Sequence, residues 1–341
     1  MNKTRRSLIS GLAAAPVAAL TSRFAYGAQE LKISHQFPGG TETEGDFRDR
    51  LCKKFAKEIA ARSKGALTAT VYPGSSLMKV NAQFSAVRKG ALDMTLLPMS
   101  YAGGEVPELN ITLLPGIVTS YEQGYAWKKN EIGKALTDLL ASKGVIIVTW
   151  VWQAGGAASR AGPIINPEDV KGLKFRGGGK EMDMTAKAAG AQTLSLPSNE
   201  TYAAMQTGAV DIVTTSSTSF ISFRLEEVSK NLTINKNGKS YWFLLEPLLM
   251  SKIVFDKLPK DQQALIMQVG GEMEKFALEG AQADDKKVID VYTKAGVKVH
   301  DLTDAALKKW VDVARPTAWK DFAEKSDSCA KFLKLAEQVK V

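Results

Sequence analysis

The sequence predicts an α/β protein of two similar lobes, each with a parallel-strand sheet and helices on both faces. Three observations lead to this prediction. Strand-like and helix-like segments alternate along the chain, two stretches repeat the same order of segments, and long segments cross between the two repeats. Without its first 28 residues the 341-residue chain is long for one core and sufficient for two domains.

The first 28 residues have the layout of an export signal and are set aside from the fold. Lys3, Arg5 and Arg6 precede an apolar stretch over 8–20, and small residues follow up to Ala28. The apolar stretch is too short to be a permanent membrane-spanning helix. The paired arginines fit a twin-arginine signal, and an ordinary secretory signal remains open. Either route predicts a periplasmic protein whose signal is cleaved near Ala28.

The charge of the remaining chain gives only a mild preference for anionic ligands. Removal of the first 28 residues lowers the formal net charge from +9 to +5. The other Lys and Arg residues are interleaved with Glu and Asp, as over 48–64, which is typical of solvated helix faces. We therefore expect no nucleic-acid partner.

The cysteines and histidines predict no metal centre. Cys52 and Cys329 lie in helical patterns at opposite ends of the chain, and an oxidising compartment permits a disulfide between them. Pairing requires close geometry, so the disulfide stays open. The two histidines, His35 and His300, have no metal-ligand spacing with these cysteines.

The first repeat begins directly after the export signal. Its expected elements are a strand over 31–37, a helix over 45–63, a strand over 67–72, a helix over 80–89 and a strand over 92–97. The second repeat has a strand over 173–176, a helix over 180–189, a strand over 193–196, a helix from Ser198 or Asn199 to 207, and a strand over 210–215.

The two repeats also share residues. AVRKGALDM at 86–94 aligns with AMQTGAVDI at 204–212. In both, a glycine ends a helix, a small residue follows, and an aspartate lies just inside a buried strand. Two unrelated turns with the same helix cap are the alternative, but the matching flanking elements favour two βαβαβ halves.

Two or three segments are expected to cross between the halves and form hinge strands and a long domain-spanning helix. These are the apolar runs 145–152 and 241–249 and the helical pattern that starts at Lys260. The expected lobe I therefore comprises 29–150 and 241–280, and lobe II comprises 151–240 and 281–341. Such crossings between α/β lobes describe a hinge with a cleft between the lobes.

The topology predicts where a ligand binds. Right-handed crossovers make the strands of each half parallel, so that their carboxyl ends share one edge, and open α/β sheets bind ligands at that edge. In the second half the edge comprises 176–177, 196–198 and 214–219; in the first half it comprises 35–40, 74–76 and 98–101.

Arg176 is the main candidate for ligand binding because it ends a strand at this edge and three glycines follow it. Its guanidinium offers planar, bidentate donors suited to a carboxylate or phosphate, and glycines allow a ligand to approach the backbone. The alternative is a structural ion pair with Glu168, Asp169 or Glu181.

Other candidates have polar or aromatic side chains near the same edge. Six hydroxyl residues follow the third strand of the second half at 214–219, although a polar loop is the usual reading of such a run. The aromatic candidates are more often core residues. The full set of candidate ligand-binding residues is Arg176, Gln153, Thr215, Ser216, Ser217, Ser198, Tyr101, Phe37 and Phe220.

The sequence contains no motif for catalysis or for a cofactor. Gly177 to Lys180 lacks the spacing and the Ser/Thr of a P-loop, and there is no Gly-x-Ser-x-Gly elbow. Neither histidine has a catalytic partner in the pattern. We therefore expect a binding protein without catalytic residues, metal or cofactor.

Several of these stretches resemble the solute-binding proteins of tripartite ATP-independent periplasmic (TRAP) transporters, DctP-type. NPEDVKGLKFR at 166–176 is similar to the family's tPeDLKGLKiR. The resemblance continues through 188–191, Leu196-Pro197, Glu200, Tyr202, 203–208 and Asp211, and Tyr72-Pro73 and 90–93 match the first lobe.

The resemblance implies the two-lobed periplasmic binding protein fold and a monomer that delivers its ligand to membrane permease subunits. It also implies that Arg176 binds the ligand carboxylate. The chain departs from the family where a second arginine is frequent, since 155–158 reads GGAA and Arg160 is shifted. Ser198 replaces a frequent Phe. These departures favour a monocarboxylate, such as a hydroxy, keto or aromatic acid. A sensor's ligand-binding component and an exported hydrolase remain as alternatives.

Overall fold

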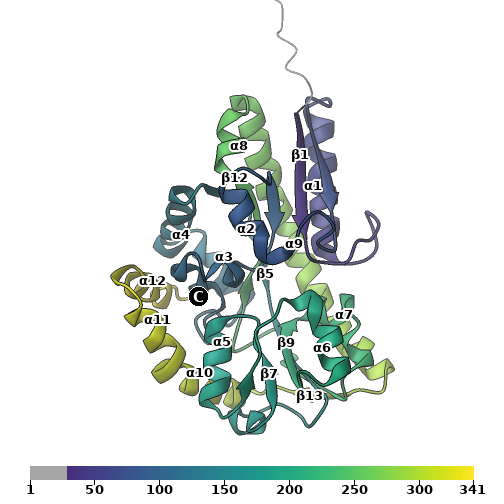
Figure 1. Cartoon of the computed structure of the whole chain (residues 1–341), viewed down its shortest axis with the longest axis vertical. Coiled ribbons are helices and arrows are strands. Elements are labelled where there is room, and N and C mark those ends of the chain that lie inside the picture. The colour runs from purple at the N-terminus through teal and green to yellow at the C-terminus, as the bar shows by residue number, and fades with distance from the viewer. Residues whose placement is uncertain (1–28) are drawn as a thin grey trace, which may run out of the picture.

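The structure is a computed structural model that describes residues 29–341 (Figure 1). The expected export signal at 1–28 lies outside the described residues. Two sheets lie at opposite ends of the molecule, with helices against their faces, and a long helix runs between them. This arrangement is the predicted two-lobed α/β fold.

The first sheet has five strands in the order β2-β1-β3-β12-β4. Their bounds are Gln29–His35 for β1, Leu67–Tyr72 for β2, Met94–Leu96 for β3, Val145–Thr149 for β4 and Leu248–Ser251 for β12. β1 runs parallel to β2 and β3, whereas β12 is antiparallel to β3 and β4.

The second sheet has six strands in the order β13-β10-β6-β9-β7-β8. Their bounds are Gly155–Ser159 for β6, Lys174–Arg176 for β7, Gln192–Thr193 for β8, Ile212–Ser216 for β9, Asn231–Ile234 for β10 and Lys298–Asp301 for β13. β7 is parallel to β8 and β9, while β6 is antiparallel to β9 and β10.

The parallel pairing predicted for the two halves is confirmed, but the sheets as a whole are mixed. The antiparallel neighbours are introduced by strands next to the crossings. The chain leaves the first sheet through β4 and returns to it through β12, so these two strands run in opposite directions. β6 likewise enters the second sheet directly after the crossing.

The helices of the two halves form where apolar spacing and end signals agree. Helix α1 (Phe47–Arg62) buries four apolar residues spaced four apart, Phe47, Leu51, Phe55 and Ile59. The other helices of the halves are α2 (Val80–Arg88), α5 (Lys180–Ala188) and α6 (Thr201–Thr207). Gly208 ends α6 with a φ of 74°, a left-handed conformation that favours glycine.

Three segments connect the lobes, as predicted. The short strands β5 (Trp152–Gln153) and β11 (Leu244–Leu245) pair antiparallel in a two-stranded sheet of their own. Helix α9 (Lys260–Lys294) packs on α1 and β4 in the first lobe and on α7 (Ser217–Ser222) and β13 in the second. It therefore spans both lobes.

The C-terminal helices return to the first lobe. Helix α10 (Asp304–Ala314) packs on α5, but α12 (Asp327–Glu337) packs on α4 (Glu131–Ser142) and on the 3-10 segment η2 (Pro107–Leu113). Phe322 of α11 (Lys320–Glu324) and Phe332 join the core of the first sheet. This packing differs from the expected division, which assigned 281–341 to lobe II. The other expected lobe boundaries stay predictions.

The remaining helices are short. They are α3 (Tyr121–Trp127) and α8 (Lys252–Lys257), and a π turn over Arg315–Trp319 joins α10 to α11. Cys52 and Cys329 are buried in the core of the first sheet, and both are free thiols. The disulfide that the sequence left open is therefore absent from the structure.

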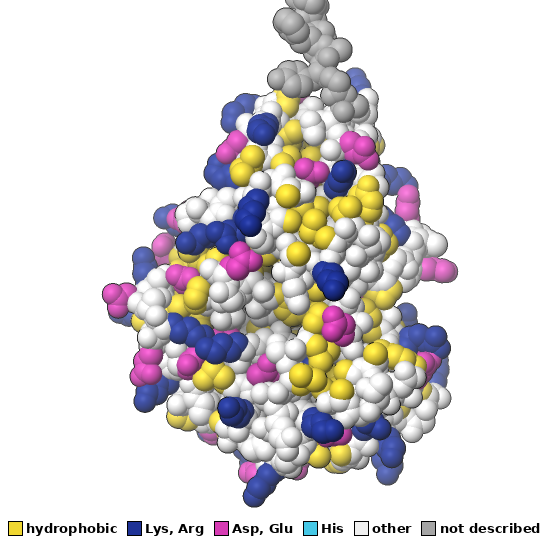
Figure 2. All heavy atoms as spheres, viewed as in Figure 1, with side chains coloured by type: hydrophobic (Ala, Val, Ile, Leu, Met, Phe, Trp, Pro, Cys, Tyr) yellow, Lys and Arg dark blue, Asp and Glu magenta, His cyan; other side chains and the backbone are white. Residues whose placement is uncertain are grey.

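The surface carries both signs of charge in close alternation. Figure 2 shows Lys and Arg side chains interspersed with Asp and Glu over the visible face, with no continuous basic stripe. No helix within residues 29–341 is long and apolar enough to cross a membrane.

Candidate ligand-binding site

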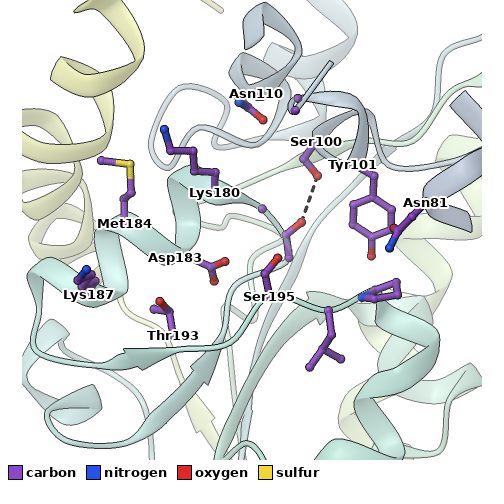
Figure 3. Close-up of a pocket in the computed structure, with 16 residues that line it drawn as sticks. Asn81, Ser100, Tyr101, Asn110, Lys180, Asp183, Met184, Lys187, Thr193 and Ser195 are labelled. Atoms are coloured by element: carbon purple, nitrogen blue, oxygen red, sulfur yellow. Dashed lines mark hydrogen bonds between the residues drawn. The ribbon is translucent and has the colours of Figure 1, made fainter. Parts of the chain in front are cut away.

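Two connected spaces lie between the lobes. The outer cleft has a volume of about 620 Å³ and is open to solvent (Figure 3). Tyr101 and Ser100 form its wall on the first lobe, and the segments around Gly178 and Ser195 form the opposite wall. The inner pocket lies next to it, shares Tyr101 and Gly178 with it, and has a free volume of only about 10 Å³.

The inner pocket is built from the strand ends that the topology pointed to, together with the crossing strand. Its lining residues are Pro98, Tyr101, Leu113, Arg176, Gly177, Gly178, Ser198, Thr214, Thr215, Trp242, Leu244 and Glu246. The structure thus brings four of the nine candidate residues to one pocket: Arg176, Tyr101, Ser198 and Thr215.

Arg176 is buried at the end of β7, with 2% of its surface exposed. Its Nε donates to the carbonyl of Leu196 at 2.9 Å, Nη1 to the carbonyl of Thr214 at 2.8 Å, and Nη2 to the hydroxyl of Tyr101 at 2.9 Å. A guanidinium has five N–H donors, so one N–H on each terminal nitrogen is left over.

No carboxylate within the described chain forms an ion pair with Arg176, so the structure does not contain the ion pair that was its alternative role. Asp169 accepts hydrogen bonds from the amides of Ile165 and Asn166, and Glu181 pairs with Lys325. An arginine buried without a directly bonded anion is costly, and an anionic ligand relieves that cost.

Tyr101 and Ser100 bridge the cleft between the lobes. The Tyr101 hydroxyl also accepts a hydrogen bond of 2.9 Å from the amide of Ser198. Ser100 donates to the carbonyl of Gly178 at 3.1 Å, the dashed contact in Figure 3. The lobes therefore meet at the mouth of the inner pocket through direct hydrogen bonds.

The crossing strand gives the pocket a polar wall. Trp242, Leu244 and Glu246 alternate along an extended segment, so their side chains lie on one face, and all three line the pocket. Gln153 is the register partner of Leu244 and thus lies on the same face. Both amide atoms of Gln153 and Nε1 of Trp242 are buried without a hydrogen-bond partner in the protein.

Glu246 belongs to a buried network around Arg48, which lies in the first turn of α1. Arg48 donates to both oxygens of Asp46, to Oε2 of Glu246 at 2.9 Å, and to the hydroxyls of Ser216 and Ser219. These contacts use all five of its N–H donors. Arg48 is thus saturated by the protein, whereas Arg176 is not.

In this network, burial and the neighbouring opposite charges act in opposite directions on the pKa of Glu246, and likewise on the pKa of Arg48. Burial raises the pKa of Glu246, and the nearby guanidinium groups of Arg48 and Arg176 oppose that rise by favouring the ionised carboxylate. Burial alone would lower the pKa of Arg48, but Asp46 and Glu246 raise it above its ordinary value. Arg48 is therefore held as a permanent cation.

Several hydroxyls of the run at 214–219 form hydrogen bonds within the protein, and most of the run does not line the pocket. Thr214 donates to the carbonyls of Arg176 and Gly177, Ser216 caps α7, and Ser217 donates to Asp285. Only Thr214 and Thr215 line the inner pocket. Among the described residues no protein hydrogen bond engages the hydroxyl of Thr215, so it can turn toward a ligand.

Phe37 and Phe220 do not line the inner pocket. The Phe37 ring stacks on the Arg48 guanidinium, whose Cζ lies 3.5 Å from the ring centroid, and it thus supports the network from behind. Phe220 packs edge-to-face against Tyr292 in a core of the second lobe. Both rings are fully buried, so neither is exposed to a ligand in this structure.

Sequence reasoning missed Arg48, Trp242 and Glu246. Arg48 was placed on a solvated helix face, and this placement is wrong because the side chain is fully buried. The position of Glu246 within an otherwise apolar run over 241–250 was a signal, since a lone charge in a buried strand requires a partner. Within residues 29–341, no cluster of three or more His, Cys, Asp or Glu side chains is arranged to hold a metal ion.

Comparison with known proteins agrees with this arrangement. The sequence profile of the bacterial extracellular solute-binding proteins, family 7 (DctP), matches residues 40–326. A solute-binding protein of Albidiferax ferrireducens is 61% identical over 335 residues, which are 98% of this chain and 99% of the relative. The 2,3-diketo-L-gulonate-binding periplasmic protein of Escherichia coli K12 is 28% identical over 340 residues, 97% of this chain and 96% of the relative.

Solved structures of TRAP periplasmic solute-binding proteins have the same fold. A TRAP periplasmic solute-binding protein from Rhodoferax ferrireducens, crystallised with bound malonate, superposes with a TM-score of 0.89 at 64% identity, covering 91% of this chain and 98% of that one. A second, from Sulfitobacter with bound β-D-galacturonate, has a TM-score of 0.82 at 20% identity and shares the fold.

Proposed function

Because the chain belongs to family 7 of the bacterial extracellular solute-binding proteins, the DctP-type receptors of TRAP transporters, we propose that it captures a small organic acid between the lobes at Arg176. The inner pocket, with about 10 Å³ of free volume in this structure, must widen to admit the acid. In this proposal the lobes close over the acid in the periplasm, after removal of the signal near Ala28. The closed monomer then delivers the acid to the membrane permease subunits, and no chemical step takes place in the pocket.

The observation that supports this function is the state of Arg176. It is buried, lacks a bonded carboxylate, and has one free N–H on each terminal nitrogen. Two N–H groups on neighbouring nitrogens can serve the two oxygens of a carboxylate. Each charge-assisted hydrogen bond of this kind contributes about 1.5–3 kcal/mol, so the pair provides much of the affinity expected of a small ligand.

The rest of the pocket favours a compact acid with further polar groups. Thr215 and Trp242 offer hydrogen-bonding groups in the pocket that Arg176 lines, and Pro98 and Leu113 give a short apolar wall. The relative from Rhodoferax ferrireducens was crystallised with bound malonate, so a receptor of this family holds an acid of three carbons. A monocarboxylate that carries a hydroxyl or keto group fits the same features.

Thermal unfolding with a panel of organic acids tests the proposal. A ligand bound only by the folded state stabilises it by about 4 kcal/mol at a thousand times its dissociation constant. We expect at least one acid to raise the Tm of the wild type strongly and that of Arg176→Ala hardly at all. Arg160→Ala is the matched control, because that arginine lies outside the pocket and should leave the ligand effect intact. Equal ligand effects in wild type and Arg176→Ala would refute the proposal.

A further inference from the structure

The inner pocket contains a carboxylate as well as a free guanidinium. Arg176 and Glu246 both line it, and the charge of Arg176 favours the ionised form of Glu246. The four buried charged residues of the site are Arg48, Arg176, Asp46 and Glu246. Their formal charges cancel, so a bound monoanion brings the site to −1 and a dianion brings it to −2.

Glu246 presents one oxygen that the protein leaves free. Its Oε2 accepts from Arg48 at 2.9 Å, and within the described chain no group donates to Oε1. Arg48 cannot serve that oxygen, since its five donors are already used. The ion pair with Arg48 at 2.9 Å favours the ionised carboxylate of Glu246. An ionised carboxylate oxygen beside a ligand requires a donor, and it repels any second anion.

We propose that Glu246 determines ligand specificity: the pocket of this chain prefers a monoanionic acid that carries a hydroxyl or amine donor over a diacid such as the malonate bound by the relative from Rhodoferax ferrireducens. This inference rests on the proposed function, because Arg176 must first hold the ligand carboxylate. The donor of the ligand then satisfies Oε1 of Glu246. An acid that lacks the donor leaves that oxygen unpaired, and a diacid places a second carboxylate beside it.

Three acids of three carbons each test this inference by isothermal titration calorimetry at pH 7.5. Lactate carries the donor, propionate lacks it, and malonate replaces it with a second carboxylate. We expect the wild type to bind lactate at least about tenfold more tightly than propionate or malonate, because a buried polar group left unpaired discriminates strongly.

The variant Glu246→Gln reverses the polarity of the pocket-facing group with little change of shape. Its amide oxygen can still accept from Arg48, and its NH2 group then faces the ligand. We expect the variant to lose at least about tenfold in lactate affinity and to gain in malonate affinity. Glu108→Gln is the control for the loss of one carboxylate outside the inner pocket. A melt followed by circular dichroism verifies that each variant is folded.

A second variant, Glu246→Asp, keeps the negative charge, but its shorter side chain moves the carboxylate away from the ligand. It should therefore weaken lactate binding without favouring malonate. Wild-type preference for malonate, absence of lactate binding, or unchanged ratios in a folded Glu246→Gln would each overturn the inference. If acids bind in an Arg176-dependent way but the ratios do not change, the proposed function stands and only this inference fails. If no acid binds in an Arg176-dependent way, both fail.

Discussion

The hydroxyl of Tyr101 accepts a hydrogen bond of 2.9 Å from the guanidinium of Arg176, and the two residues come from different lobes. The same hydroxyl accepts the amide of Ser198 at 2.9 Å. One oxygen atom of the first lobe therefore joins both the proposed carboxylate-binding arginine and the loop beside it. We therefore expect ligand binding at Arg176 to be coupled to closure of the cleft.

Loss of that hydroxyl should weaken the closed state. In Tyr101→Phe the amide of Ser198 and one N–H of Arg176 lose their partner, and each buried donor left unpaired costs about 1–3 kcal/mol. We expect about tenfold weaker binding of the preferred acid, mainly through faster dissociation, measured by stopped-flow fluorescence. Tyr202→Phe is the control, since that hydroxyl bonds only Glu227 on the surface. Equal dissociation rates for wild type and Tyr101→Phe would contradict the coupling.

A second contact between lobes predicts a pH dependence of stability. Asp285 of the spanning helix α9 accepts hydrogen bonds from Tyr121 at 2.7 Å and from Ser217 at 2.5 Å. Burial raises the pKa of Asp285 to about 6, above its ordinary value of 3.8. The folded state thus binds this proton more tightly than the unfolded state, and the contribution of Asp285 to stability falls as pH rises from 4 to 6.

The variant Asp285→Asn should lack the pH-dependent contribution of Asp285 to the free energy of unfolding. We expect it to gain stability relative to the wild type, by on the order of 2 kcal/mol, as pH rises from 4 to 7. Urea unfolding of both proteins at several pH values measures the difference in their free energies of unfolding. Contributions of other carboxylates, such as Asp183, are the same in both proteins and cancel in this difference. A difference that stays constant with pH would show that Asp285 has an ordinary pKa in the folded protein.

The two cysteines predict insensitivity to reductants. Cys52 and Cys329 are free, and burial raises the pKa of both thiols, which keeps them protonated and unreactive. We expect Ellman's reagent to find no fast-reacting thiol in the folded protein and two in denaturant, with no change of Tm on addition of dithiothreitol. In the chain-entropy relation a disulfide closing so long a loop would contribute about 5–6 kcal/mol, so a marked fall of Tm would reveal one.

Most of the fold was predictable because it follows from local patterns. Apolar spacing and glycine caps located the elements of both halves, and β2 occupies the same residues, 67–72, that the sequence predicted. Arg176 followed from topology, since a strand end at the shared edge of a parallel sheet faces the cleft. The return of α12 to the first lobe was not predictable, because its apolar face can cover either lobe and only tertiary packing selects one.

The missed part of the site depends on residues far apart in the chain. Arg48 and Glu246 bond each other across 198 positions, and no local pattern distinguishes Arg48 from the solvated Lys and Arg residues that follow it in α1. The hydroxyl run at 214–219 was located correctly, but sequence does not reveal which hydroxyls the protein itself engages. Ser217, for example, bonds Asp285 in the spanning helix.

The spanning helix offers a test of its own packing with two neighbouring glycines. A Cβ added at Gly270 would lie 2.3 Å from the carbonyl oxygen of Val148 in β4, whereas a Cβ added at Gly271 would meet nothing within 4 Å. The backbone of β4 is held by its hydrogen bonds to β12 and cannot move aside without a loss of stability. Gly270→Ala must therefore push α9 away from β4. We expect a loss of about 1–3 kcal/mol in the free energy of unfolding.

Gly271→Ala is the matched change on the open side of the same helix turn. Alanine restricts the unfolded chain and suits a helix interior, so this variant should gain about 0.5–1 kcal/mol. Urea unfolding measures both. Opposite signs would establish that the close approach of α9 to β4 at Gly270 fixes the helix on the first lobe. A stabilised Gly270→Ala would mean that the helix can shift without loss, and the hinge would then have a looser attachment than these contacts imply.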